Sequence, residues 1–279
     1  MGFLSPGQVV WFEIGTTDPD AVTGFYGPLL GWSFEADPDS SVDGRTYTRV
    51  FAPGAPWPMG AVQQGDTGGE AINLSVLSAD VPADVDQLTR LGATVVVPAT
   101  QVADVTVFAR LKDPRGNVLS LFSRGESARL AERAQATEEH MQQAATAPQP
   151  GAMAWFEIGT TDLQATTDFY AAAFGWRIEK DETAGGKPYF SIFGPGAEWP
   201  SGGLWDHSGG SAEGAGADYM MPCFLVPDVA VTTAVAEQAG ARVEYGPDTN
   251  PDGPAFCRLL DPRGNRFGLF SSPVRTADA

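Results

Sequence analysis

Apolar and polar residues alternate through two segments of the chain, residues 9–15 (VVWFEIG) and 153–159 (MAWFEIG), and both are rich in aromatic and β-branched side chains. This pattern predicts a β-strand in each place. After the first strand, Asp18 and Pro19 have the form of a helix start, with Asp18 as the N-cap. Gly31 is suited to end that helix, because glycine readily adopts the left-handed backbone conformation of a helix C-terminus.

Each half of the chain continues with short apolar strands and one further helix, which ends at Gly92 in the first half and at Gly240 in the second. The predicted strands lie near residues 46–51, 59–63 and 72–76, and near 189–193, 203–205, 222–226, 242–245, 255–260 and 266–270. The predicted fold class is therefore α+β. Each half is a pair of βαβββ modules that form one curved, mixed eight-stranded sheet with helices on the outside.

A repeat runs through these elements: WFEIGTTD occurs at residues 11–18 and 155–162, and DPRGN occurs at 113–117 and 261–265. Repetition on this scale indicates that a whole domain has been duplicated. We expect a first domain over residues 1–125, a helical linker over 126–150 and a second domain over 151–279. The linker is rich in Ala, Glu, Gln and Arg, which favour a helix.

Composition and charge narrow the classes of partner. The formal net charge of −18 argues against binding to nucleic acid, which requires clustered Lys and Arg, and against docking on anionic membranes. No apolar stretch is long enough to span a bilayer and no signal-peptide pattern is present, so a cytoplasmic protein is expected. Cys223 and Cys257 could pair across neighbouring strands, but two buried, reduced thiols are the expected state in that compartment.

The βαβββ pairs, the strand motif WFEIGTTD and the terminal motif DPRGN resemble the vicinal oxygen chelate superfamily, which includes glyoxalases, extradiol dioxygenases and bleomycin-binding proteins. Within it, the chain resembles tandem two-domain proteins of actinomycetes, some of them from anthracycline (daunorubicin-type) pathways. Metal-using members carry His or Gln on the first strand of a domain and Glu on the last. Here Trp11 and Trp155 stand at the first position, and Ser120 and Gly268 at the second. We therefore expect no metal and no other cofactor.

The alternation in the first strand places Trp11 and Glu13 opposite the apolar Phe12 and Ile14, on the concave side where the resemblance implies ligand binding. The other candidate ligand-binding residues, on the same side of the first and last strands, are Ser120, Phe122, Trp155, Glu157, Arg266, Gly268 and Phe270. One interpretation is a cleft with indole walls and a carboxylate for a ligand cation or hydroxyl. The other is that the tryptophans fill a former metal site and that the carboxylate pairs with a basic residue or a backbone amide.

Differences between the copies predict clefts of different size in the two domains. Arg266 and the small Gly268 occupy the places of Val118 and Ser120, so we expect the second cleft to be roomier. The arginines of the two DPRGN motifs, Arg115 and Arg263, are expected to be turn residues on the surface.

These features favour metal-independent, non-enzymatic binding of an anthracycline-like aromatic natural product, for self-resistance or in support of its biosynthesis. The ligand would be small, aromatic and of a kind that can carry a positive charge. One alternative is a metal-independent isomerase, cyclase or hydrolase of a polyketide pathway, with Glu13 or Glu157 as general base. Another is a metal-dependent enzyme of the glyoxalase or dioxygenase type. Contact with a pathway enzyme is a further expectation, and both a monomer and a homodimer are compatible with the sequence.

Overall fold

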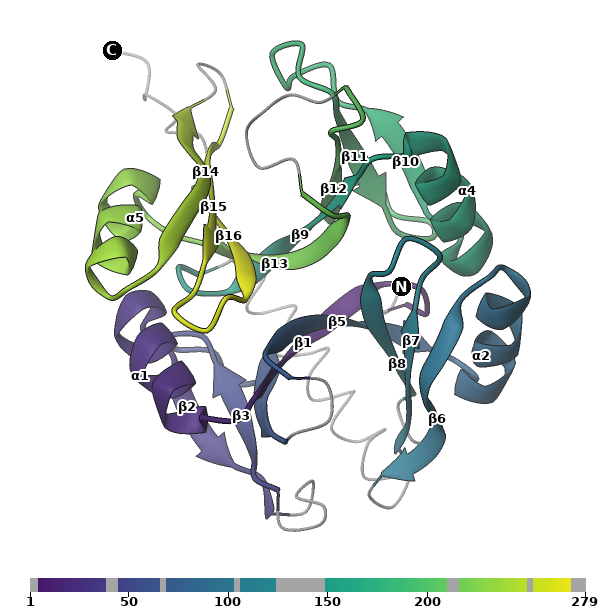
Figure 1. Cartoon of the computed structure of the whole chain (residues 1–279), viewed down its shortest axis with the longest axis horizontal. Helices are drawn as coiled ribbons and strands as arrows, with labels where there is room; N and C mark the ends of the chain where they lie inside the picture. Colours follow the sequence, from purple (N-terminus) through teal and green to yellow (C-terminus); the bar gives the residue numbers. More distant parts are fainter. Residues whose placement is uncertain are drawn as a thin grey trace.

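The computed structural model of the chain describes residues 5–38, 45–65, 69–102, 106–123, 149–209, 216–249 and 253–271. It contains two curved sheets, one from each half of the chain, and the helices lie on the convex side of each sheet (Figure 1). The helix predicted within residues 126–150 lies outside the described residues.

The first domain is built from two βαβββ modules. The first module contains β1 (Val9–Thr16), α1 (Pro19–Leu30), β2 (Ser33–Ala36), β3 (Tyr47–Phe51) and β4 (Gly60–Gln64). The second contains β5 (Ala71–Ser78), α2 (Val81–Arg90), β6 (Thr94–Val102), β7 (Thr106–Lys112) and β8 (Val118–Ser123). The modules join where β1 pairs antiparallel with β5, which gives the eight-stranded order β2-β3-β4-β1-β5-β8-β7-β6.

The second domain repeats this plan strand by strand. Its first module contains β9 (Met153–Thr160), α4 (Leu163–Phe174), β10 (Arg177–Lys180), β11 (Tyr189–Phe193) and β12 (Gly202–Asp206). Its second contains β13 (Tyr219–Leu225), α5 (Val229–Gln238), β14 (Arg242–Thr249), β15 (Ala255–Leu260) and β16 (Arg266–Ser271). The order β10-β11-β12-β9-β13-β16-β15-β14 confirms the predicted α+β fold class.

Local signals set the ends of the first helix as predicted. The Asp18 side chain accepts a hydrogen bond from the backbone N–H of Ala21 at 3.0 Å, and Gly31 ends the helix with a φ of 69°. The edge strands β2 and β10 were not located from the sequence, because both are four residues long and mostly exposed, so neither has a buried face to produce alternation. Among the described residues, none of the helices has the length and apolar character needed to cross a membrane.

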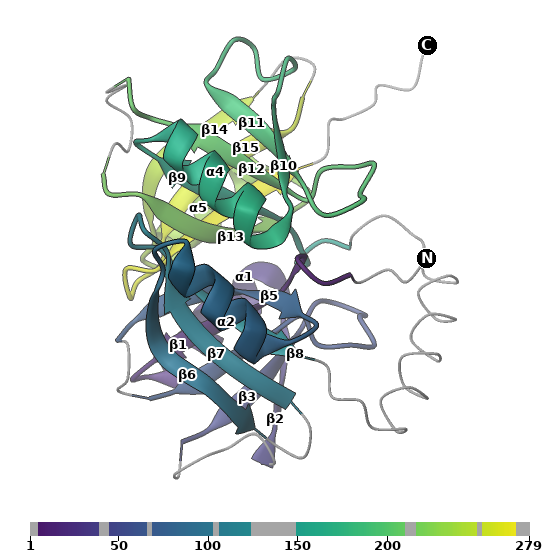
Figure 2. The same cartoon turned by 90° about the vertical axis from the view of Figure 1, so that its right-hand side faces the viewer.

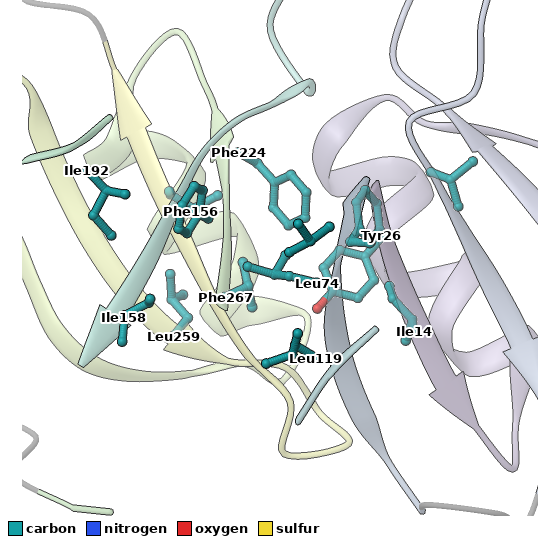
Figure 3. Close-up of a cluster of buried hydrophobic side chains, with 14 of the residues drawn as sticks. Ile14, Tyr26, Leu74, Leu119, Phe156, Ile158, Ile192, Phe224, Leu259 and Phe267 are labelled. Atoms are coloured by element: carbon teal, nitrogen blue, oxygen red, sulfur yellow. The ribbon is translucent and has the colours of Figure 1, made fainter. Parts of the chain in front are cut away.

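The two sheets pack back to back, and their concave faces open toward opposite ends of the molecule (Figure 1). The views in Figures 1 and 2 both place α1 beside α5 and α2 beside α4, so each helix of one domain flanks a helix of the other. Apolar side chains from both sheets form one core in which Phe224 and Phe267 lie beside Tyr26 and Leu74 (Figure 3). The tandem domains therefore share a core rather than touching at their surfaces.

Two buried hydrogen bonds related by the repeat cross this core. The Tyr26 hydroxyl donates to Asp261 at 3.0 Å, and the Tyr170 hydroxyl donates to Asp113 at 2.8 Å. Burial, reinforced by the neighbouring aspartate, raises the pKa of both tyrosines well above the ordinary value. Each hydroxyl is therefore a neutral donor to an aspartate of the other domain's DPRGN motif.

The arginines of the DPRGN motifs lie in turns and are partly exposed, as predicted, but they also bind the opposite domain, which was not predicted. Arg115 donates to Asp218 at 2.6 Å, and Arg263 donates to Glu70 and also to the Thr17 hydroxyl at 2.8 Å. The turn that presents each arginine projects toward the neighbouring domain. Much of the repeated sequence thus serves the interface between domains.

Candidate ligand cavity in the second sheet

The concave face of the second sheet holds a cavity of about 310 Å³ with mainly aromatic walls. Six aromatic side chains from six strands line it: Trp155, Tyr189, Trp205, Tyr245, Phe256 and Phe270. Strand pairing brings them together, because Tyr189 lies opposite Trp205 and Phe256 lies opposite Phe270 in register. Side chains at paired positions point to the same face of a sheet, so each pair adds two rings to one wall.

The aromatic side chains of β9, β11 and β12 contact one another, and one of them also contacts the edge strand β14. The Trp155 indole N–H donates to the Tyr189 hydroxyl at 3.1 Å, and the Trp205 and Tyr245 ring centroids are 5.5 Å apart. Burial, together with the nearby Glu157, raises the pKa of Tyr189 well above the ordinary value. The Tyr189 hydroxyl is therefore uncharged at neutral pH.

A buried ion pair lies beneath the aromatic wall. Arg258 on β15 donates to Glu157 on β9 at 2.8 Å, and their side chains are 2% and 1% exposed. The Tyr219 hydroxyl donates to the same carboxylate at 2.6 Å, and the Arg258 guanidinium lies 4.6 Å from the centroid of the Tyr219 ring. Glu157 is thus held by a cation and a hydroxyl, as a buried carboxylate requires.

The first domain contains the same pair. Arg110 donates to Glu13 at 2.9 Å, and the Tyr47 hydroxyl contacts this carboxylate at 3.2 Å. Burial, followed by the effect of Glu13, raises the pKa of Tyr47. In both domains, therefore, the first-strand glutamate pairs with a basic residue, which is the second of the two interpretations of the sequence.

The two arginines were missed as site residues, although the sequence holds a signal for them. Arg110 and Arg258 occupy the same place before the DPRGN motifs, in FARLKDPRGN (108–117) and FCRLLDPRGN (256–265). On the N-terminal side of that motif, both copies carry the sequence Phe-x-Arg-Leu. A repeated arginine in an apolar strand indicates a buried carboxylate opposite it.

Lys187, Asp248 and Tyr245 join the two edges of the second sheet, and we call them the edge clasp. Lys187 precedes β11 and donates to Asp248 on β14, and Tyr245 donates to the same carboxylate. Hydrogen bonds from Lys187 and Tyr245 lower the pKa of Asp248. Burial favours the neutral form of Lys187, but the hydrogen bonds and charges of Asp248 and Tyr245 together outweigh it and raise the lysine pKa. The clasp is therefore a charged pair at the rim of the cavity.

Three of the predicted second-domain residues, Trp155, Glu157 and Phe270, line this cavity. Gly268 and Arg266 lie elsewhere. A Cβ at Gly268 would stand 2.6 Å from the Cys223 sulfur, so that thiol fills the space left by the missing side chain. Arg266 contacts Glu244 at 2.5 Å. Cys223 and Cys257 are both buried and free, as expected.

The predicted first-domain residues are arranged differently. Ser120 accepts a hydrogen bond from Arg110 at 3.4 Å and so belongs to the ion-pair cluster, together with Glu13. The pocket described beside this cluster measures only about 20 Å³, and neither Trp11 nor Phe122 lines it. The space in the second cleft is bounded by aromatic rings and does not arise from Gly268.

The side chains at the positions of the family's metal ligands do not fit a metal. Trp155 has no ligating atom, and Gly268 lies against the Cys223 thiol. The nearby carboxylate, Glu157, already binds Arg258, whose buried positive charge would repel a divalent cation. Across the described parts of the chain, no three His, Cys, Asp or Glu side chains form a group that could hold a metal ion.

His207 is the one histidine in the described segments, and it does not change this conclusion. It is 4% exposed, its ring lies 6.2 Å from that of Tyr219, and no described residue contacts its ring nitrogens by hydrogen bond. Desolvation lowers the pKa of this imidazole despite the nearby Asp218. A neutral imidazole is a potential ligand, but a transition-metal site needs several donors that converge on one point.

Comparisons with known proteins agree with the duplicated fold. Residues 10–122 match the family described as "Glyoxalase-like domain", and residues 152–269 match the "Glyoxalase/Bleomycin resistance protein/Dioxygenase superfamily". The chain is 27% identical to CFP32 of Mycobacterium bovis, with 93% of each chain covered. It is 26% identical to the anthracycline biosynthesis protein DnrV of Streptomyces peucetius, covering 95% of this chain and 94% of that protein. Among solved structures, the Mn(II)-bound glyoxalase from Novosphingobium aromaticivorans has the same fold, with a TM-score of 0.58, 14% identity, and coverage of 95% of this chain and 82% of that one.

Proposed function

The chain belongs to the Glyoxalase/Bleomycin resistance protein/Dioxygenase superfamily, with two domains in tandem, and from this premise we propose that its second domain binds a flat aromatic natural product without a metal. The observation that carries the proposal is the cavity of about 310 Å³ walled by aromatic rings. Small-molecule sites are concave, mainly apolar and of about 300–1,000 Å³, with a few polar groups that orient the ligand. The cavity meets each of these conditions.

The cavity walls and the relatives both support an aromatic ligand. Planar fused rings stack on indole and phenol rings more favourably than aliphatic ligands of the same size. DnrV and the similar DauV of Streptomyces sp. are both named anthracycline biosynthesis proteins, and anthracyclines carry such fused rings. Binding one of these compounds would serve self-resistance or support its biosynthesis by removing free product.

Calorimetric titration with daunorubicin tests the proposal. We expect saturable binding to one site, and Phe270→Leu should weaken it roughly two- to tenfold because one wall loses its ring. Phe122→Leu, the matched change in the first domain, should leave the affinity unchanged. The absence of saturable binding to daunorubicin and to uncharged aromatic polyketides would refute the proposal, as would equal losses in the two variants.

The enzymatic alternatives require turnover, and two measurements distinguish them from binding. Ligand recovered after long incubation with the protein should be chemically unchanged, whereas a converted product would identify an enzyme. Elemental analysis should find no stoichiometric transition metal, because the residues at the family's ligand positions do not fit one. A stoichiometric metal that is lost with activity on chelation would support the glyoxalase or dioxygenase type instead.

A further inference from the structure

The side chains that line the cavity carry more negative than positive charge. Three carboxylates lie in its lining, those of Glu157, Asp181 and Asp248. Glu157 is paired with Arg258, and Asp248 is paired with Lys187 in the edge clasp. Within the parts of the chain that the structure describes, Asp181 forms no ion pair with a basic side chain.

The contacts of Asp181 come from neutral donors. The backbone N–H and the hydroxyl of Thr183 donate to it at 2.8 and 2.6 Å, and the Ser191 hydroxyl donates at 3.3 Å. These bonds fix the carboxylate in place at the end of β10 but supply no positive charge. A half-buried carboxylate in such a setting attracts a cation from the ligand.

The first domain shows how the same position is neutralised. Asp37 corresponds to Asp181, because the backbone N–H of each donates to a corresponding tyrosine carbonyl, Tyr47 at 2.8 Å and Tyr189 at 2.9 Å. Arg49 on β3 lies 3.8 Å from the Asp37 carboxylate and donates a hydrogen bond to Glu35 at 2.9 Å, so one arginine lies beside both acidic residues.

In the second domain, Ser191 takes the place of that arginine. Arg49 pairs in register with Glu35 in the first sheet, and Ser191 pairs in register with Glu179 in the second. The second domain therefore has no arginine at the position that lies beside this aspartate in the first, and Asp181 lines the cavity of about 310 Å³.

We propose that the ligand of the second domain is an aromatic compound with a protonated amine, and that Asp181 is the residue that selects for the charge. This inference rests on the proposed function and adds the chemical class of the ligand. The rings of the ligand stack on the aromatic wall, and its ammonium group binds the Asp181 carboxylate at the cavity edge. Lys187 does not compete for this carboxylate, because it is held by Asp248. Glu157, the residue first expected to bind a ligand cation, is already occupied by Arg258.

The test compares daunorubicin, which carries an amino sugar, with its N-acetyl derivative, which lacks the charge. In calorimetric titrations, the wild-type protein should bind the amine about tenfold more tightly, consistent with one charge-assisted contact. Asp181→Asn should remove this preference and leave the affinity for the acetylated form within about twofold. Ser191→Arg should have the same effect, because it supplies the cation that Arg49 provides in the first domain.

Two controls separate charge selection from disturbance of the fold. Ser191→Ala removes the hydroxyl contact without adding charge, so the preference should persist. Arg49→Ser removes the arginine beside the corresponding aspartate of the first domain and should change neither affinity. Equal binding of the two compounds by the wild type, or a preference that survives Asp181→Asn, would overturn the inference while the proposed function stands. If neither compound bound, the proposed function would fail, and the inference with it.

Discussion

At the scale of single residues, the position that decides the chemistry of each sheet is the first-strand glutamate. The face of the sheet on which Glu13 lies was predictable, because side chains alternate along a strand and its neighbours Phe12 and Ile14 are fully buried on the other face. Its partner was not predicted, since the arginine comes from a strand near the other end of the domain. Pairing across that distance depends on how the modules close into one sheet, which alternation along one strand does not specify.

Removing Arg258 should be costly for the fold. Arg258→Met leaves Glu157 buried without a cation, and the loss of such a partner typically costs about 3–5 kcal/mol of unfolding free energy. Urea denaturation followed by circular dichroism measures it. The matched variant Arg110→Met should lose less, because the Glu13 and Arg110 side chains keep some solvent contact, at 10% and 12% exposure.

A double variant shows whether the cost comes from the unpaired charge. Replacing both partners, as Glu157→Leu with Arg258→Met, should recover much of the stability lost in Arg258→Met alone, because no buried charge remains. If the double variant were less stable than Arg258→Met, the loss would come from packing around the guanidinium rather than from the carboxylate.

At the scale of elements, both copies of the first strand carry a glycine at the same position, with different neighbours. Gly159 on β9 leaves room for the ring of Tyr219, because a Cβ at this position would lie 2.0 Å from that ring. At Gly15 on β1, the nearest atom to a Cβ would be a backbone oxygen at 3.5 Å, an ordinary contact. Here the repeated sequence is identical, yet the space around it differs because Ala71 occupies the place of Tyr219.

Gly159→Ala is therefore expected to displace the Tyr219 ring from the buried ion pair and destabilise the second domain by about 1–3 kcal/mol, as overpacking usually does. Gly15→Ala should change stability by less than about 1 kcal/mol. Thermal unfolding of the two variants makes the comparison. Equal effects would show that the tyrosine moves aside without cost.

The elements themselves were largely predictable, and the exceptions have physical reasons. Strands rich in aromatic and aliphatic residues, such as β1 and β11, could be located, whereas β2 and β10 could not because they are four residues long and mostly exposed. Assigning the cavity's size to Gly268 failed for a different reason. A small residue leaves room only if no neighbour takes it, and Cys223 does.

At the scale of the whole molecule, the arrangement of the domains could not be predicted from the strand pattern. The repeated motifs identified the duplication, but their tyrosines, aspartates and arginines bind across the interface. That role becomes visible only when the convex faces are seen to pack together (Figure 1). A polar residue in a turn has the same pattern in sequence whether it faces solvent or another domain.

The interface should weaken in acid. The hydrogen bond from Arg263 lowers the pKa of Glu70 from 4.5 to about 2. Because the folded-state pKa lies below the unfolded one, this carboxylate stabilises the protein above pH 4.5, and its contribution is lost as the pH falls toward 2. At Asp218, burial would raise the pKa, but hydrogen bonds from Arg115 and Thr161 outweigh it and lower the pKa, so it acts in the same sense.

Glu70→Gln isolates this effect. Its stability should lie below that of the wild type near neutral pH, and the difference should shrink between pH 4.5 and 2 as the wild-type carboxylate becomes protonated. Urea denaturation at a series of pH values measures both proteins. A difference that stayed constant through this range would mean that the contact does not depend on the charge of Glu70.

The back-to-back pairing has a mutational consequence that follows from both sheets being in one chain. In an assembly of two identical subunits, every substitution appears twice, so a change that enlarges the cavity of one subunit enlarges both. Here Ser191 and Arg49 differ although they occupy matching positions, and the shared core is untouched by the difference. One copy can keep its residues and support the fold, while the other is free to change the walls and the charge of its cavity for a new ligand.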